Sequence, residues 1–315
     1  MSANLDVVTF GEAMLLLIAA EPGPLAAVQT FHKGTAGAET NVATGLARLG
    51  FHVGWASRLG TDSMGAYLLE TMQREGIDCS HVTLDPIQRT GMMFKGKTED
   101  GSDPLVEYHR KGSAASWMTP YDLDEKWLSR ARHLHVTGIF PALSPGCLEL
   151  TRRAIRVMRD AGGSVSFDPN LRPALWQSQD VMRATLNELA ASCDTVLPGV
   201  AEGLALAGTC EPAAIARFFR QRGAARVIVK LGPDGAYFDD EVAGTGIVPV
   251  HPVSRVVDTV GAGDGFAVGV ISALLEGRGV VEAVRRGAWI GACAVQVSGD
   301  TEGLPNRREL EAACL

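Results

Sequence analysis

Short, predominantly apolar runs of strand length alternate with runs of helical period along most of this chain. Residues 7–10, 133–138 and 226–232 fit buried strands that end at glycine-containing or polar turns. The helical runs between such strands carry the serine caps, first-turn prolines and terminal glycines that are typical of helix boundaries. Repeated strand-helix units predict an α/β fold with a mainly parallel central sheet flanked by helices. Ligands bind beyond the carboxyl ends of such strands, so we expect the chemistry in loops such as 168–172 and 261–264.

Residues 90–111 interrupt this alternation. They form two short strand-type runs around a polar turn of Asp, Gly and Pro residues, without a helical period. Together with the strand-type run that begins near residue 13, they are expected to form a small β-sheet lid, built from about residues 12–36 and 90–112. A lid of this kind excludes water from a reaction site. The prediction is one domain over residues 1–315 that includes this lid.

The stretch 256–277 contains the strongest candidate for a reaction centre. In chain order it holds Asp258 and Thr259, which we expect to close a strand, then the small residues Gly261, Ala262 and Gly263, then Asp264 at the start of an apolar helix. Small residues let the amides of a helix N-terminus approach an anion such as phosphate. A carboxylate placed there suits a general base, while the amides stabilise a phosphoryl group in transit. The alternative is a tight turn followed by a first-turn acid, which helices favour anyway.

Charge and cysteine content limit the classes of partner. The 315-residue chain has a formal net charge of −7 and no basic run, which argues against a nucleic-acid partner. Its six cysteines form no CxxC pair, so neither a zinc cage nor a disulfide framework is expected. The chain starts without a basic leader, and the apolar run 13–20 is too short to span a membrane. We therefore expect a cytoplasmic protein that acts on small molecules, with no nucleic acid and no membrane partner.

The motif at residues 258–264 resembles the D-T-x-G-A-G-D signature of ribokinase-type (PfkB) carbohydrate kinases, and all its fixed positions are present. The resemblance implies a ribokinase-like three-layer fold and phosphorylation of a sugar by ATP with Mg²⁺. It also implies that the amides of Gly261, Ala262 and Gly263 form an anion hole for the nucleotide phosphates, and that Asp264 deprotonates the acceptor hydroxyl. The resemblance extends from about Gly11 to Pro305, which is almost the whole chain.

An earlier segment resembles the first signature of the same family, GG-x-x-x-N followed by two spaced glycines. Gly37, Asn41, Gly50 and Gly60 carry it. The resemblance implies that Gly37 and Asn41 bind the sugar. Glu39 departs from the pattern, because most members have a small residue there. From the residues alone, a helix start and its cap is an equal alternative.

Tyr108, Arg110 and Arg172 lie in segments where loops should converge, and they indicate an anionic acceptor, because a guanidinium group matches a carboxylate bidentately. The alternative is that both arginines form surface ion pairs. The strings Y-x-R-K-G-S-A, P-A-L-S-P and D-x-N-x-R-x-x-L-W look like the 2-keto-3-deoxygluconate kinase branch of the family, where the matching residues hold the sugar acid. Met93 departs from that branch, which often has a tyrosine on this strand. Alternation along a strand should turn His109 away from the site.

The nucleotide side is expected at two segments. Glu202 fits the acidic position of the family's N-x-x-E motif, which implies action on Mg²⁺ through water, although Gly199 replaces the Asn. The alternative is that Glu202 caps the following helix as a first-turn acid. Lys230, Gly232 and Gly235 resemble the family's nucleotide-binding turn, where glycines allow close approach. The resemblance leaves a requirement for a monovalent cation open.

The activity that the resemblance implies is transfer of the γ-phosphoryl group of ATP to the terminal hydroxyl of 2-keto-3-deoxygluconate. A neutral-sugar kinase of the fructokinase or ribokinase type is the alternative within the fold. A non-catalytic sugar or nucleotide sensor is the alternative from another class, and an intact Asp264 in an intact anion loop argues against it. Exposed lid edges favour a homo-oligomer that pairs through the lid.

Residues 91–98, GMMFKGKT, match the P-loop pattern G-x-x-x-x-G-K-[ST]. A P-loop follows a buried strand and opens a helix that holds the phosphates. Here a polar Asp-Pro segment precedes the match and a turn of Asp, Gly and Pro residues follows it. We therefore expect the match to be accidental.

If this is correct, Lys97→Ala leaves the dissociation constant for ATP nearly unchanged, because the lysine does not reach the phosphates. Titration calorimetry with ATP measures this directly. A large rise in the dissociation constant would restore the P-loop hypothesis.

Overall fold

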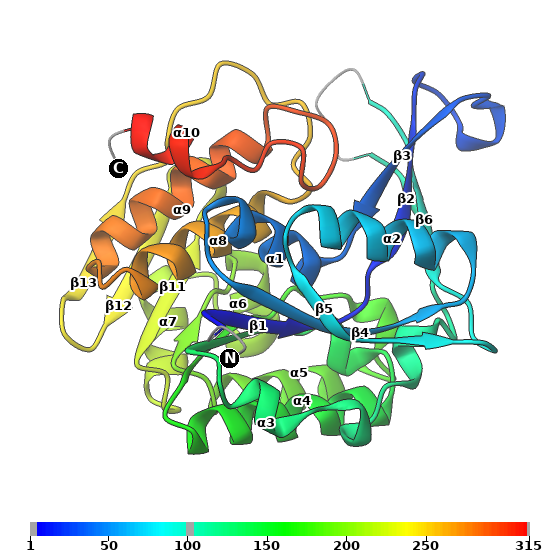
Figure 1. Ribbon diagram of the computed structural model, residues 1–315. Helices are drawn as coiled ribbons and strands as arrows, with labels where there is room; N and C mark the ends of the chain where they lie inside the picture. Colours follow the sequence, from blue (N-terminus) through cyan, green and yellow to red (C-terminus); the bar gives the residue numbers. More distant parts are fainter. Residues whose placement is uncertain (1–4, 99–103, 314–315) are drawn as a thin grey trace.

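The computed structural model describes residues 5–98 and 104–313, and it is built around one nine-stranded sheet with helices on both faces (Figure 1). The strand order is β13-β12-β11-β10-β9-β8-β1-β4-β5. The strands are β1 (Val7–Phe10), β4 (Val53–Gly60), β5 (Asp78–Asp85), β8 (His133–Thr137), β9 (Ser164–Asp168), β10 (Thr195–Val196), β11 (Arg226–Lys230), β12 (Ala236–Asp240) and β13 (Gly244–Val248). All neighbours pair in parallel except β11 with β12 and β12 with β13. The predicted mainly parallel α/β fold is confirmed.

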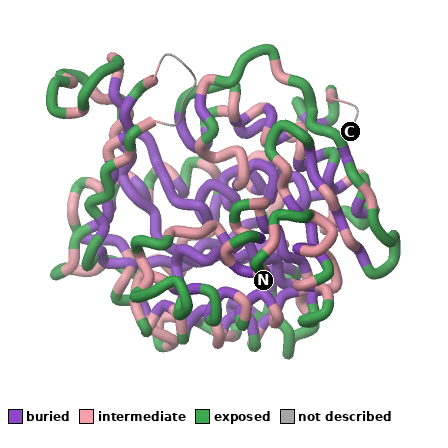
Figure 2. The backbone as a smooth tube through the Cα atoms, turned by 180° about the vertical axis from the view of Figure 1, so that it is seen from behind, coloured by how far each residue is buried: buried purple, intermediate pink, exposed green. Residues whose placement is uncertain are grey.

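Each face of this sheet has its own apolar core. Side chains alternate along a strand, so Val7 of the central β1 enters one core while Val8 and Phe10 enter the other. Figure 2 shows that the buried backbone runs through the middle of the molecule.

The helices are α1 (Ala38–Arg48), α2 (Ser63–Arg74), α3 (Glu125–Leu128), α4 (Pro145–Asp160), α5 (Gln179–Ala190), α6 (Val200–Ala207), α7 (Pro212–Arg220), α8 (Ala262–Leu275), α9 (Val280–Ala294) and α10 (Arg307–Ala312).

Helix α8 is buried on all sides, as an apolar sequence without a polar face requires. Glycines allow its neighbours to come close. A methyl group on Gly269 would lie 2.4 Å from the backbone nitrogen of Gly287 in α9, and one on Gly45 in α1 would lie 2.5 Å from the Val268 side chain. These contacts hold α8 between two helices, so the position of its N-terminus is fixed by packing.

The lid is a separate four-stranded sheet in the order β3-β2-β6-β7. Its strands are β2 (Met14–Ala19), β3 (Phe31–Ala36), β6 (Gly91–Lys95) and β7 (Val106–His109). Both predicted lid segments therefore contribute strands, while part of the turn between β6 and β7, residues 99–103, lies outside the described residues. The first five residues of the P-loop match form strand β6 itself, and Lys97 donates to the carbonyl of Ala20 at 2.9 Å.

The strand predicted to end at Asp258 and Thr259 is wrong. Strand β13 ends at Val248, and no helix or strand spans residues 249–261. The N–H groups of Val257 and Asp258 both bond to the carbonyl of Val295, at 2.7 and 3.2 Å, and so do not form a strand ladder. Residues 258–263, which precede α8, are called the anion loop below. The end of α9 at Val295 and the side chain of Asp258 position this loop.

A search of the described residues for membrane-spanning helices found no helix of sufficient length and apolarity.

Candidate active site

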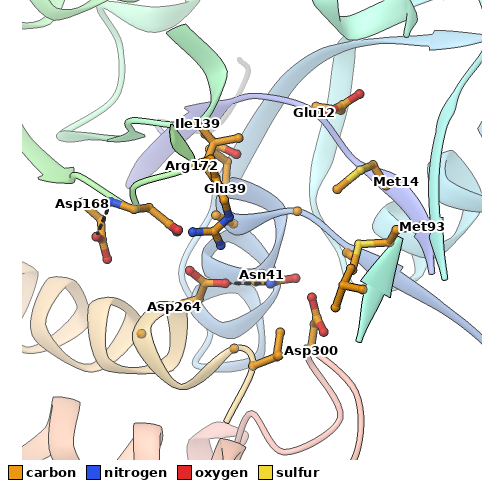
Figure 3. Close-up of a pocket in the computed structure, with 18 of the residues that line it drawn as sticks. Glu12, Met14, Glu39, Asn41, Met93, Ile139, Asp168, Arg172, Asp264 and Asp300 are labelled. Carbon is orange, nitrogen blue, oxygen red and sulfur yellow. Dashed lines mark hydrogen bonds between the residues drawn. The ribbon is translucent and has the colours of Figure 1, made fainter. Parts of the chain in front are cut away.

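A cavity of about 400 Å³ lies between the lid and the loops that follow the parallel strands (Figure 3). Met14 and Met93 of the lid line one side, and Asp168, at the carboxyl end of β9, lines the other. This is the location expected for an α/β sheet. The predicted site residues that it brings together are Gly37, Asn41, Tyr108, Arg110, Arg172, Glu202, Lys230, Gly261, Gly263 and Asp264.

A second cavity of about 570 Å³ adjoins the first, and its walls are mostly apolar. It contains the other predicted nucleotide-side and loop residues, Gly232, Gly235 and Ala262. The two cavities have Lys230, Thr259 and Gly263 in common. One loop at the start of α8 therefore faces both a polar cavity and an apolar cavity.

Asp264 lies in the first turn of α8, and the Nδ2 group of Asn41 donates to its Oδ2 at 2.7 Å. The pKa of Asp264 is raised to about 7, mainly by burial and also by the nearby charges of Asp168 and Asp300, against the lowering effects of Asn41 and Lys230. A carboxyl with a pKa near neutrality can exchange a proton at physiological pH.

The loop before Asp264 needs glycine. Gly261 has a φ of 83°, in the left-handed region, and a methyl group on it would lie 2.6 Å from the carbonyl oxygen of Asp300. At the start of α8 the first N–H groups have no carbonyl partner within the helix, as at every helix N-terminus. The geometry therefore fits an anion site, as predicted for Gly261, Ala262 and Gly263.

Asn41 lies at the start of α1, but its side chain bonds to Asp264 and does not cap the helix. Its Oδ1 atom is buried and has no hydrogen-bond partner among the described residues. Gly37 precedes it with a φ of 151°, and a methyl group there would lie 2.5 Å from the carbonyl oxygen of Glu12. The side-chain amide of Asn41 thus donates to the candidate base through its nitrogen, while its oxygen remains able to accept a hydrogen bond from a ligand in the cavity.

The two predicted arginines differ in their surroundings. Arg110 is 8% exposed and forms an ion pair with the buried carboxylate of Glu12, so it is not a surface ion pair. Its Nε atom is buried and has no acceptor among the described residues. Arg172 donates to the carbonyl of Leu171 at 2.9 Å and pairs with no carboxylate in the described part of the chain. Arg172 therefore supplies positive charge that no side chain balances, whereas Glu12 balances Arg110.

Two other predicted orientations can be compared with the structure. Tyr108 lines the cavity at the lid edge and is 46% exposed. His109, the next residue, packs edge-on against Phe94 with the ring centroids 5.6 Å apart, as strand alternation predicts.

Glu39 is buried in the cavity wall and accepts a 2.6 Å hydrogen bond from Thr137. Its pKa is raised to about 7, mainly by burial and also by the Glu12 charge, whereas Thr137 and Arg110 act in the opposite direction. Gly11 accommodates this large residue, since a methyl group at Gly11 would lie 2.6 Å from the Glu39 carboxylate. The departure from the small residue of the family pattern therefore places a titratable group beside the candidate sugar pocket.

Glu202 takes the capping role that the sequence left open. Its Oε2 accepts from the N–H of Gly199 at 2.6 Å, and its Oε1 accepts from the N–H of Leu171 at 3.0 Å. Burial raises its pKa. Because each oxygen accepts only one of these bonds, either can still accept from a water molecule. The carboxylate thus joins the start of α6 to the loop after β9.

Lys230 lies beside Glu202 and forms an ion pair with Asp168, 2.6 Å from Nζ to Oδ2. Burial lowers the pKa of Lys230, but the charges of Asp168 and Glu202 outweigh it and raise that pKa overall. In the described residues no group of three His, Cys, Asp or Glu side chains could hold a metal directly. The donors fit Mg²⁺ that keeps its water and binds mainly to phosphate oxygens.

Sequence reasoning did not single out Glu12, Lys95 and Asp300. Glu12 follows strand β1 at its carboxyl end, which is the position where functional side chains are expected. Lys95 follows Gly91 and Met93 at a spacing of two residues, which is the signal for the inward face of a strand. Asp300 belongs to a loop far from the other site residues in the sequence; residues 299–305 resemble a segment of the same family branch, but that resemblance assigns no role to Asp300.

A helix N-terminus with a buried carboxyl lies between a polar and an apolar cavity under a β lid, which is an arrangement suited to phosphoryl transfer. The model of the pfkB family carbohydrate kinases matches residues 4–307, and the chain belongs to this family.

The chain is 49% identical to 2-dehydro-3-deoxygluconokinase from Bacillus subtilis (strain 168), over 98% of this chain and 94% of the relative. Among solved structures, it is similar to a PfkB protein from Polaromonas sp. JS666, with 63% identity, a TM-score of 0.90 and coverage of 98% and 99% of the two chains. It is also similar to a putative ribokinase II from E. coli in complex with ATP and Mg²⁺, with 27% identity, a TM-score of 0.89 and coverage of 98% of each chain.

The raised pKa of Asp264 predicts a pH-dependent gain in stability for Asp264→Asn. The folded-state pKa of about 7 exceeds the unfolded value of about 4, so the folded protein holds this proton more tightly. This contribution to stability is fully present below pH 4 or so and is lost as the pH rises through about 7. The variant lacks the ionisation, so it should be more stable than the parent at pH 8, by at most about 4 kcal/mol, and similar to it near pH 4. Thermal unfolding of both proteins at the two pH values tests this, and a difference independent of pH would contradict it.

Proposed function

We propose that this chain transfers the γ-phosphoryl group of ATP to the terminal hydroxyl of 2-keto-3-deoxygluconate (2-dehydro-3-deoxygluconate) and forms the 6-phosphate. The observation that carries the proposal is the position of Asp264, a carboxyl with a pKa of about 7 at the N-terminus of α8, where the two cavities meet. The similarity to a 2-dehydro-3-deoxygluconokinase over almost the whole chain supports the choice of acceptor.

In this mechanism Asp264 accepts the proton of the attacking hydroxyl, and Asn41 holds the carboxylate in place through their 2.7 Å bond. The amides from Gly261 to Asp264 stabilise the negative charge of the transferred group at the helix N-terminus. When bound, ATP supplies the phosphoryl group and Mg²⁺ shields its charge. Gly232 and Gly235 line the cavity that suits the nucleotide.

Glu202 and Lys230 would act at the phosphates. Lys230 lines both cavities, so its ammonium group is placed to contact an anion at their junction. Glu202 would orient water on Mg²⁺ while it keeps its two backbone contacts. Its capping and metal-positioning roles are therefore compatible.

On the acceptor side, Arg172 would bind the carboxylate of the sugar acid, because its charge is unbalanced in the cavity. Arg110 would donate its unpartnered Nε–H, and Tyr108 would add a hydroxyl at the lid edge. Gly37 and the open Oδ1 of Asn41 would contact sugar hydroxyls. Two of these assignments, the Nε–H of Arg110 and the Oδ1 of Asn41, place a buried polar atom that has no hydrogen-bond partner among the described residues against a polar sugar acid.

The proposal treats residues 1–315 as one cytoplasmic kinase unit whose four-stranded sheet closes over the acceptor and excludes water. The outer strands β3 and β7 leave edges that suit pairing with a second copy.

A neutral-sugar kinase is the second candidate. Two observations favour it: Glu12 already balances the charge of Arg110, and Met93 lines the cavity where a tyrosine is frequent in the sugar-acid branch. In that case Arg172 alone would not ensure a preference for acids.

A coupled assay of ATP consumption over sugar acids and neutral sugars tests the proposal. We expect 2-keto-3-deoxygluconate to have the highest kcat/KM. Asp264→Asn should lower kcat by about 10² or more with little change in the KM for ATP, because it removes the base and keeps the size. Faster turnover of fructose or ribose would favour the second candidate, and an absence of ATP consumption with every acceptor would favour a sensor.

Arg172→Ala tests the basis of acceptor choice. Loss of a charge-assisted pair with the sugar acid should lower kcat/KM for 2-keto-3-deoxygluconate by about 30-fold or more, equivalent to about 2 kcal/mol or more. Turnover of fructose, which has no carboxylate, should barely change. Arg156→Ala, at an exposed position on α4, is the matched control and should alter neither substrate. Equal losses on both substrates would assign Arg172 to the phosphates or to the fold.

A further inference from the structure

Lys95, the last residue of lid strand β6, is only 1% exposed and lies between two buried carboxylates of the main body. Its Nζ atom is 2.5 Å from Oδ2 of Asp258 and 3.4 Å from Oδ1 of Asp300. These two acids are 7% and 5% exposed. The cluster is a lysine from the lid inserted between two acids behind the anion loop.

Strand alternation explains how a lysine reaches this position. Gly91, Met93 and Lys95 are the buried residues of β6 and share one face. Met93 lines the 400 Å³ cavity under the lid, called the acceptor cavity here (Figure 3). Lys95 is the next residue on the same inward face of β6. A buried ammonium group is costly unless it is paired, and both of its partners lie outside the lid sheet.

The two acids also hold the loop that precedes α8. Asp258 accepts from the N–H of Val260 at 3.1 Å through Oδ1 and from the N–H of Gly299 at 3.5 Å through Oδ2. The backbone carbonyl of Asp300 lies against Gly261. A methyl group added to Gly261 would lie 2.6 Å from that carbonyl oxygen. The position of Gly261 therefore depends on the two acids that Lys95 joins.

The same cluster reaches the candidate base. Asn41, which donates to Asp264, also lowers the pKa of Asp300, and the Asp300 charge is one of the groups that raise the pKa of Asp264. Burial raises the pKa of Asp300, and Lys95 opposes this shift. Without Lys95, the buried carboxylates Asp258 and Asp300 would repel each other, and the loop they hold would have to move or take up another cation.

We propose that Lys95 is a positioning residue for phosphoryl transfer, whose ammonium group joins Asp258 to Asp300, fixes the anion loop, and supplies from the chain itself the positive charge that these two buried acids require. The inference rests on the proposed kinase activity for its kinetic consequences. This role links the lid to the reaction centre, because a displacement of β6 would withdraw the Lys95 ammonium group from the two acids that hold the anion loop. It also predicts that no monovalent cation is required between these two acids, since Lys95 occupies the position.

The first test is Lys95→Met, which keeps the length and removes the charge, assayed on the best acceptor from the substrate panel. We expect kcat to fall by about 10-fold or more, with the KM values for acceptor and ATP within a few-fold of the parent. Ammonium or ethylammonium ions should partly restore kcat and raise the melting temperature of the variant, because they can enter between the two acids. Tetramethylammonium, which cannot donate hydrogen bonds, should do neither. Lys97→Met, two residues further along, is the matched control and should behave like the parent, because Lys97 is exposed and, among the described residues, donates to the carbonyl of Ala20 and pairs with no carboxylate.

The second test needs no substitution, so it decides the matter even if Lys95→Met does not fold. The parent enzyme should turn over equally in potassium, sodium and tetramethylammonium chloride at constant ionic strength, and its melting temperature should be the same in all three. A kcat that is more than about threefold higher in potassium chloride than in the other two salts would overturn the inference. Such a difference would mean that an external cation completes the loop. Parent-like kcat in Lys95→Met, or a loss that small ammonium ions restore in neither kcat nor melting temperature, would also overturn it. If the parent phosphorylates no acceptor, the proposed function fails, while the melting temperatures of parent and variant in these salts still judge the role of Lys95.

Discussion

The structure depends on a buried helix N-terminus that carries a carboxyl group. Close contacts with α1 and α9 fix α8, and the glycine loop before it turns the first amides toward the junction of the two cavities. Burial of Asp264 beside Asp168 and Asp300 costs stability when the group ionises, and the same burial raises its pKa to about 7. A group adapted to exchange a proton at neutral pH is therefore also a source of strain in the fold.

Buried ion pairs connect the lid to the nine-stranded body. Arg110, just after β7, pairs with Glu12, and Lys95 of β6 pairs with Asp258 and Asp300. Such pairs add little net stability, because desolvation offsets their attraction, but an unpaired partner is strongly unfavourable. Their effect is on geometry, since the lid can dock in only one register without leaving a buried charge alone. The shape of the acceptor cavity and the arrangement of the anion loop are thus coupled.

Charge balance in the acceptor cavity bears on selectivity. Glu12 balances Arg110, and Lys230 is balanced by Asp168, whereas Arg172 pairs with no carboxylate among residues 5–98 and 104–313. Glu39 adds a carboxyl with a pKa of about 7 beside Arg110. An anionic acceptor would favour the protonated form of Glu39, because two nearby negative charges repel. The cavity therefore combines one fixed cation with groups whose charge responds to the ligand.

Much of the fold and part of the site could be predicted from local sequence patterns. Alternating strand and helical periods predicted the mainly parallel sheet and the lid, and the spacing of Gly261, Gly263 and Asp264 predicted a glycine loop that opens a helix with a carboxyl in its first turn, because such features depend on neighbours in the chain. The strand expected before that loop was wrong, because its N–H groups bond to Val295 and not to another strand. Only the tertiary structure decided which charges meet. Lys95 and Asp300 are 205 residues apart, and no periodicity or propensity encodes a contact over that separation, which arises when the lid docks on the body and buried charges must find partners.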